Sequence, residues 1–92
     1  MTKSEATAQE VAAWMFQKLR QQRELNQDDV VDYVARIFGS QFTYSNELGN
    51  PAIKKMVLDA FKKLTGNDVV WERARRLWRF RERHDLPGRM QP

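Results

Sequence analysis

Apolar residues recur every three or four positions in three stretches of the first two-thirds of the chain, which is the spacing of amphipathic helices. In the first stretch they share one face: Val11, Ala12, Met15 and Leu19. Thr7 stands three residues before Glu10, the spacing of a capping box, in which each side chain satisfies a free backbone N–H of the first turn. The pattern predicts a first helix from about residue 7 to about residue 23.

The second helix has clear start and stop signals. Asn26 is a favoured N-cap, and Asp28 and Asp29 place negative charge in the first turn, where the helix dipole stabilises it. The apolar face that follows is wide: Val30, Tyr33, Val34, Ile37 and Phe38. Gly39 suits the left-handed conformation that commonly ends a helix, so we expect this helix to end there.

A short strand and a third helix are predicted next. Phe42-Thr43-Tyr44 alternates in polarity and precedes the turn-forming residues 45–50, SNELGN. Asn50-Pro51 has the residue types favoured at the N-cap and at the first helical position, so we expect the third helix to begin there. Its apolar residues recur at helical spacing as far as Gly66: Ile53, Met56, Val57, Ala60, Phe61 and Leu64.

Residues 69–83, VVWERARRLWRFRER, admit two interpretations. A hairpin centred between residues 74 and 75 would form the cross-strand pairs Val69–Phe80, Trp71–Trp78 and Arg73–Arg76. Aromatic and β-branched pairs of this kind stabilise a sheet, although Ala-Arg is a poor two-residue turn and a slightly wider loop would keep the same register. A helix would leave Phe80 facing solvent and would line up arginines four residues apart. We therefore favour the hairpin over the helix.

The length of 92 residues, with 41% hydrophobic and 30% charged residues, indicates a single globular domain. We expect an α+β fold in which residues 1–83 form one compact domain of three helices, a short strand and a C-terminal β-hairpin. Residues 84–92, HDLPGRMQP, contain a Pro-Gly turn and little to bury. They are expected to form an extended C-terminal tail.

The net charge of +4 is confined to the last quarter of the chain. Residues 1–68 carry nine basic and nine acidic side chains, whereas residues 69–92 carry seven arginines and three acidic residues. Such an asymmetry indicates an anionic partner, and we expect DNA or another polyanion. The expected contacts are to the phosphate backbone, from the hairpin and from a second basic strip on the third helix: Arg73, Arg75, Arg76, Arg79, Arg81, Lys54, Lys55 and Lys62.

The same residues also have a purely structural interpretation. Trp71, Trp78 and Phe80 would then cover the helices as part of the core, and the arginines would pair with Glu72 and Glu82. Asp59 would neutralise one of the neighbouring lysines. The alternative function is a protein-interaction module that self-associates as a homodimer, because tryptophan and arginine are enriched at binding hot spots.

Catalytic signals are missing from the sequence. There is no cysteine, and the single histidine, His84, stands beside Asp85 with no nucleophile placed near it by a known motif. We therefore expect no enzymatic activity, no cofactor and no metal. The N-terminus lacks the apolar run of a signal peptide, and no stretch is long enough to cross a membrane, so a cytoplasmic location is expected.

The order of the predicted elements resembles a winged helix-turn-helix arrangement with residues 69–81 as the wing. In that fold a short strand usually lies between the first and second helices, whereas here it is predicted after the second. Four segments also look like a family of small uncharacterised bacterial proteins: QDDVVDYVARIFGSQF, NPAIKKMVLDAFKKLTG, VVWERARRLWRFRE and DLPGR. This resemblance implies a bacterial, cytosolic single domain, of a type that also occurs on mobile elements such as integron cassettes.

Overall fold

The computed structural model describes residues 6–92, so residues 1–5 of the expected domain lie outside the described residues. The fold is α+β, as predicted. Its elements are α1 (Ala8–Gln22), β1 (Glu24–Asn26), α2 (Gln27–Ile37), β2 (Thr43–Ser45), β3 (Pro51–Ile53), α3 (Lys55–Thr65), β4 (Val69–Glu72), β5 (Leu77–Phe80) and β6 (Met90–Gln91). Single 3-10 turns precede β2 (Ser40–Phe42) and β4 (Gly66–Asp68).

The first two helices begin where their capping residues predict. The Thr7 side chain accepts a hydrogen bond from the backbone N–H of Glu10 at 3.1 Å, and α1 ends at Arg23, which adopts a left-handed conformation with φ 72°. The Asn26 side chain accepts from the backbone N–H of Asp28 at 2.9 Å. These caps satisfy N–H groups that have no partner within their own helix.

The hairpin at residues 69–80 is confirmed, and its register is the predicted one. Val69 lies opposite Phe80, and Trp71 lies opposite Trp78 with ring centroids 4.8 Å apart. The connection is a four-residue turn over residues 73–76, in which Arg76 adopts a positive φ of 54°. The wider loop therefore replaces the unfavourable two-residue Ala-Arg turn.

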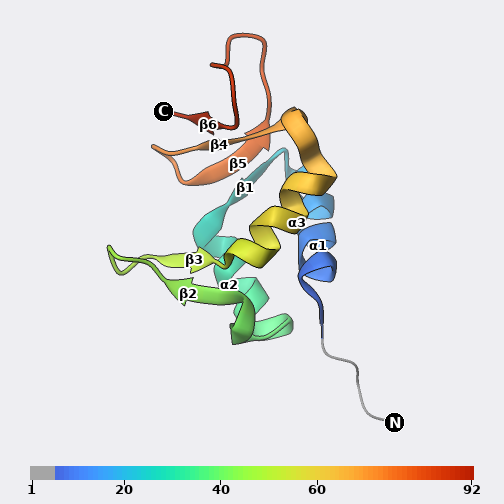
Figure 1. Cartoon of the computed structure of the whole chain (residues 1–92), viewed down its shortest axis with the longest axis vertical. Helices are drawn as coiled ribbons and strands as arrows, with labels where there is room; N and C mark the ends of the chain where they lie inside the picture. The colour runs from blue at the N-terminus through green and yellow to red at the C-terminus, as the bar shows by residue number, and fades with distance from the viewer. Residues whose placement is uncertain (1–5) are drawn as a thin grey trace.

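The hairpin forms the centre of a four-stranded sheet of order β1-β5-β4-β6 (Figure 1). Strand β1 pairs antiparallel with β5, with Leu25 opposite Trp78, and β6 pairs parallel with β4. Strand β1 was not predicted, because its three residues stand between two helices and its partner lies about fifty residues later in the chain.

The prediction that α3 begins at Asn50-Pro51 is wrong. The structure places Pro51 at the start of β3, which pairs antiparallel with β2, and α3 begins at Lys55. The Asn46 side chain accepts hydrogen bonds from the backbone N–H groups of Leu48 and Asn50, both at 3.0 Å, and so closes the loop of a second hairpin. Burial of Ala52 and Ile53 in the extended conformation outweighs the helix-start preference of the Asn-Pro pair.

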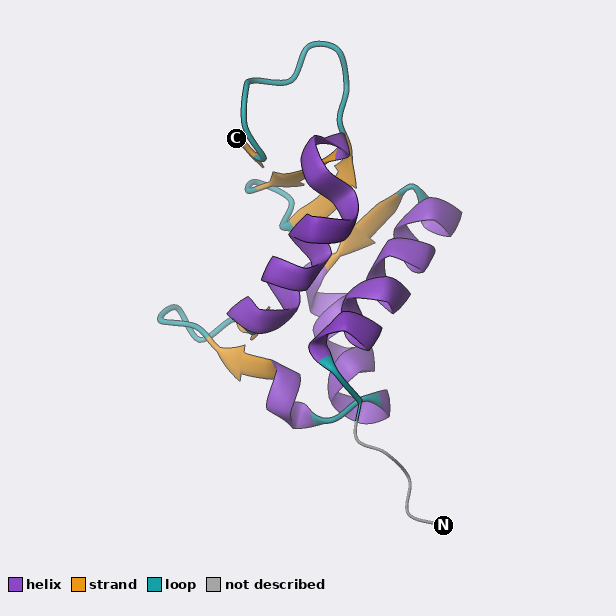
Figure 2. Ribbon diagram, turned by 45° about the vertical axis from the view of Figure 1, so that its right-hand side comes forward, coloured by secondary structure: helices purple, strands orange, loops and turns teal. Residues whose placement is uncertain are grey.

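The core lies where α1, α3 and the four-stranded sheet meet. Helices α1 and α3 lie side by side (Figure 2). Phe61 of α3 is fully buried and contacts Trp78 edge to face, with ring centroids 5.7 Å apart. Trp14 stacks on Tyr33 at 4.2 Å and thereby joins α1 to α2. Trp78 is a core residue, as its structural interpretation predicted, and Trp71 and Phe80 pack against the core while remaining partly exposed.

The segment expected as an extended tail contributes the edge strand β6. The backbone N–H of Trp71 donates to the carbonyl of Arg89 at 2.7 Å, and that of Arg73 donates to the carbonyl of Gln91 at 3.0 Å. The Gln91 side chain is buried and exchanges two hydrogen bonds with the backbone of Leu86. The tail was expected to bury little. It does bury the polar side chain of Gln91, whereas its apolar residues Leu86 and Met90 are exposed. Within residues 6–92, no helix has the length and apolar character needed to cross a membrane.

Candidate functional site

The hairpin arginines differ in how many hydrogen bonds their guanidinium groups already make within the protein. Arg79 is held inside the domain, with a side chain only 13% exposed. Its Nε donates to Glu72 at 2.8 Å, while Nη1 and Nη2 donate to the two carboxylate oxygens of Asp85 at 2.9 and 2.8 Å. All three of its nitrogens are therefore used within the protein, and Arg79 has no free donor edge for a phosphate.

The ionisation of this network follows from its hydrogen bonds. Hydrogen bonds from Arg75 and then Arg79 lower the pKa of Glu72 to about 2. The pKa of Asp85 is well below its usual range because Arg79 and the backbone N–H of Glu82 both donate to it. Asp85 and Glu72 in turn raise the pKa of Arg79. The three side chains therefore form a fully charged structural unit.

Three more predicted site residues connect the hairpin to its neighbours. Arg75 donates to Glu72 and reaches Glu24 of β1, with Nη1 to Oε2 at 3.4 Å. Arg76 donates to Asp28 at the start of α2 at 2.7 Å. The guanidinium of Arg81 donates to the backbone carbonyls of residues 67, 86 and 88, which fixes the loop that leads to β6. All three arginines make tertiary contacts, which leaves fewer donors for a ligand.

The remaining predicted residues are more available. Arg73, at the beginning of the hairpin turn, is exposed and has no acidic partner among residues 6–92. Lys54 and Lys62 are likewise exposed and unpaired within that range. Lys55 pairs with Asp59 at 2.8 Å, but both side chains are mostly exposed, so the pair exchanges readily with solvent. Among the predicted site residues, those without an acidic partner therefore lie at the hairpin turn, at the N-cap of α3 and on α3 itself.

A groove of about 350 Å³ is lined by residues of the hairpin β2–β3, of the four-stranded sheet and of α3. Figure 1 shows these three elements next to one another. The walls of the groove are mostly apolar and include Ile53, Phe61, Trp71 and Trp78. Its charged and polar lining includes the basic Lys62 and Arg89, the acidic Asp59 and the neutral Gln27. Gln27 and Arg89 were not predicted as site residues. Gln27 directly follows β1 and Arg89 directly precedes β6, and both reach this groove only because these strands pair with the sheet.

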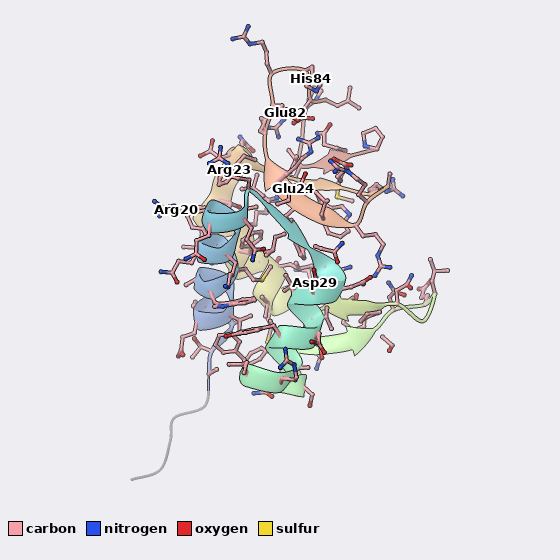
Figure 3. The ribbon with its side chains drawn as sticks, turned by 180° about the vertical axis from the view of Figure 1, so that it is seen from behind. Arg20, Arg23, Glu24, Asp29, Glu82 and His84 are labelled. Atoms are coloured by element: carbon pink, nitrogen blue, oxygen red, sulfur yellow. The ribbon has the colours of Figure 1, made fainter. Side chains whose placement is uncertain are left out.

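A second basic cluster lies at the end of α1. Figure 3 shows Arg20 and Arg23 there, with Glu82 and His84 on the loop that follows β5. The guanidinium of Arg23 stands over the ring of Phe80, 5.3 Å from its centroid. Arg23, Arg81 and Arg83 line an open hollow that also holds Asp68, Glu82 and Asp85, so its charge is largely balanced. It is a weaker anion site than the hairpin turn and α3.

Within the part of the chain that the structure describes, no group of three or more histidine, cysteine and acidic side chains is placed to hold a metal ion. No curated protein and no solved structure matches this chain. One family model matches residues 7–80, which span the domain from the cap of α1 to the end of β5. The chain belongs to this family, which is described as a family of unknown function, DUF6953.

Proposed function

We propose that this protein binds nucleic acid through backbone contacts from the turn of the β4–β5 hairpin and from α3. The observation that carries the proposal is a group of three exposed cations that have no acidic partner in the described part of the chain: Arg73, Lys54 and Lys62. They lie in the hairpin turn, at the N-cap of α3 and on α3. Lysine and arginine side chains of this kind bind phosphates and release condensed counterions, which drives association at low salt.

The topology supports the same assignment. In a winged helix-turn-helix arrangement a strand between the first two helices joins the sheet of the wing. Strand β1 stands in that position and pairs with β5, which gives the order β1-β5-β4 for this part of the sheet. The β4–β5 hairpin then corresponds to the wing and α3 to the helix before it. The β2–β3 hairpin between α2 and α3 is a departure from that arrangement.

The contacts are expected to be independent of base sequence. The exposed side of α3 carries lysines and Asp59 rather than a row of Asn, Gln and Arg side chains that would read base edges. Lys62 of α3 and Trp71 of β4 line the same groove, so the two elements lie close together there. Trp71 stands only two residues before Arg73. One phosphate backbone could therefore be followed from the helix to the hairpin turn.

Titration of fluorescently labelled duplex and single-stranded DNA, followed by anisotropy at about 50 and 200 mM salt, tests this proposal. We expect binding that weakens steeply with salt, and a loss of at least about tenfold in affinity in the double variant Arg73→Gln/Lys62→Gln at low salt. The matched control is Lys18→Gln/Arg36→Gln, which removes the same charge from α1 and α2. Absence of binding at low salt, or an equal loss in the control, would contradict the proposal.

Self-association is a second candidate, favoured by one observation. Met56 and Leu64 of α3 are 46% and 48% exposed, and with Ala13 of α1 they line an apolar hollow of about 230 Å³. Sedimentation velocity over a hundredfold range of protein concentration distinguishes the candidates. If this hollow is an interface, the sedimentation coefficient rises with concentration and Met56→Ser/Leu64→Ser abolishes the rise. A constant monomeric value would exclude the homodimer.

A further inference from the structure

Arg89 is a partly buried cation without a counter-charge. Its Nη1 donates to the Thr65 hydroxyl at 3.0 Å and to the carbonyl of Gly66, and both acceptors are neutral. No carboxylate of residues 6–92 pairs with it, whereas Arg76 and Arg79, which are also partly buried, are bound to Asp28 and Asp85. Burial, with a contribution from the charge of Arg81, lowers the pKa of Arg89. An anion beside this guanidinium would relieve the cost of its burial.

The groove that Arg89 lines is built like a small-molecule site. Its volume of about 350 Å³ is at the lower end of the range of ligand pockets, which suits a ligand smaller than a typical drug. Trp78, Phe61 and Ile53 are buried and form a rigid apolar wall, and the partly exposed ring of Trp71 presents an aromatic surface. Lys62 contributes a second positive charge. Asp59 also lines the groove, but its carboxylate is paired with Lys55 at 2.8 Å, whereas Lys62 and Arg89 have no acidic partner among residues 6–92. The groove therefore joins an aromatic wall to a cationic end.

Gln27 adds a neutral polar group to this groove. The residue is only 9% exposed, and its side-chain amide makes no hydrogen bond to another side chain or backbone group in the described part of the chain. No inaccessible side-chain nitrogen or oxygen among residues 6–92 lacks a hydrogen-bond partner, so the amide retains access to solvent. Gln27 is one of the residues that line the groove. A ligand there would find an NH₂ donor group and an oxygen acceptor on a nearly buried residue.

We propose that this groove binds a small aromatic carboxylate. The carboxylate would lie on Arg89 and Lys62, and the ring would pack against Trp71 and Trp78. Guanidinium and carboxylate groups form short, charge-assisted hydrogen bonds, which supplies the missing counter-charge. Aromatic rings prefer offset or edge-to-face contacts such as those a wall of two indoles offers. This inference concerns a second ligand and does not rest on nucleic-acid binding.

The three tryptophans allow a direct test by NMR. In a titration of the full-length, ¹⁵N-labelled protein with phenylacetate, we expect saturable shifts of the indole N–H signals of Trp71 and Trp78. The indole of Trp14 stacks on Tyr33 away from the groove and is expected to stay unchanged. The neutral isostere phenylacetamide is expected to bind at least about tenfold more weakly, because it cannot form the charge-assisted contact.

Two variants connect the binding to the cationic end of the groove. Arg89→Gln is expected to weaken phenylacetate binding at least about tenfold. Because that change also removes the contacts to Thr65 and Gly66, Lys62→Gln is a second variant whose exposed side chain makes no such contact. Arg83→Gln removes the same charge at an exposed residue outside the groove and is expected to leave the affinity unchanged.

Three results would overturn the inference. The first is the absence of saturable shifts of Trp71 and Trp78 up to about 20 mM phenylacetate, a concentration at which even a millimolar site is nearly full. The second is equal affinity for phenylacetate and phenylacetamide. The third is unchanged affinity in folded Arg89→Gln and Lys62→Gln proteins. No DNA is present in this titration, so its outcome is separate from that of the nucleic-acid experiment.

Discussion

Replacing Phe61 by alanine is expected to lower the free energy of unfolding by about 3–5 kcal/mol, the range for removal of a buried aromatic side chain. Phe61 is fully buried on α3 and contacts Trp78 of β5. Its loss leaves a cavity between the helix and the sheet that rigid neighbours fill only in part. Domains of this size have about 5–15 kcal/mol of total stability, so the variant should be close to unfolding in dilute urea.

Urea denaturation followed by far-ultraviolet circular dichroism measures this loss. Leu64→Ala is the matched control, because Leu64 lies on the same helix but is 48% exposed, and we expect a cost below about 1 kcal/mol. If Phe61→Ala does not fold at all, Phe61→Leu retains most of the volume and is expected to cost less than about 1.5 kcal/mol. Equal urea concentrations at the midpoint of unfolding for Phe61→Ala and Leu64→Ala would contradict the assignment of Phe61 to the core.

Replacing Arg79 by methionine is expected to lower the melting temperature at pH 7 by at least about 8 °C, because it leaves the carboxylate of Asp85 without its cation in a nearly buried position. The difference should depend on pH. The folded-state pKa values of Glu72 and Asp85 are below their ordinary values, so the stability they contribute is fully present above about pH 4.5. The contribution of Glu72 is lost as the pH falls toward its folded-state pKa of about 2, and that of Asp85, whose pKa is lower, continues to fall below that pH.

The difference in melting temperature between the wild type and Arg79→Met should therefore shrink steadily as the pH falls from about 4.5 to 2. Thermal unfolding across this pH range measures the effect. Arg83→Met removes the same charge at an exposed residue, and we expect a change of no more than about 3 °C with no such pH dependence. A pH-independent difference for Arg79→Met would show that the residue stabilises by packing alone.

Local signals in the sequence predict the helices and the central hairpin well. The caps at Thr7 and Asn26 act within three residues of themselves, so the chain needs no distant partner to form them. The register of the β4–β5 hairpin follows from pairing its aromatic and β-branched residues across a short turn. Where the sequence pattern is long or its partners are close, prediction and structure agree.

The short strands could not be predicted in the same way. Strands β1, β3 and β6 have three residues or fewer, too few for a periodic pattern. Their conformations depend on partners elsewhere: β1 on β5, β3 on β2, and β6 on β4. At Pro51, a local helix-start preference competes with the burial of the two residues that follow, and the burial is stronger.

The sequence predicted which residue types form the candidate site, but not which of these side chains are free to bind a ligand. The sequence indicates where the arginines are concentrated, yet it does not show that Arg79 is enclosed by Glu72 and Asp85 or that Arg81 holds backbone carbonyls. Arg73 and Arg79 have similar neighbours in sequence, but the first is exposed and the second is a structural residue. The distinction arises from tertiary packing, which also creates the groove around Arg89.

The short edge strands have a consequence for self-assembly of the unfolded and nascent chain. The central pair, VVWE and LWRF, is rich in β-branched and aromatic residues, a composition that favours intermolecular cross-β pairing when its edges are open. In the folded protein β1 covers the edge of β5, and β6 covers the edge of β4. During synthesis β1 emerges before this pair and β6 only after it, so the β4 edge is the last to gain its protection against aggregation.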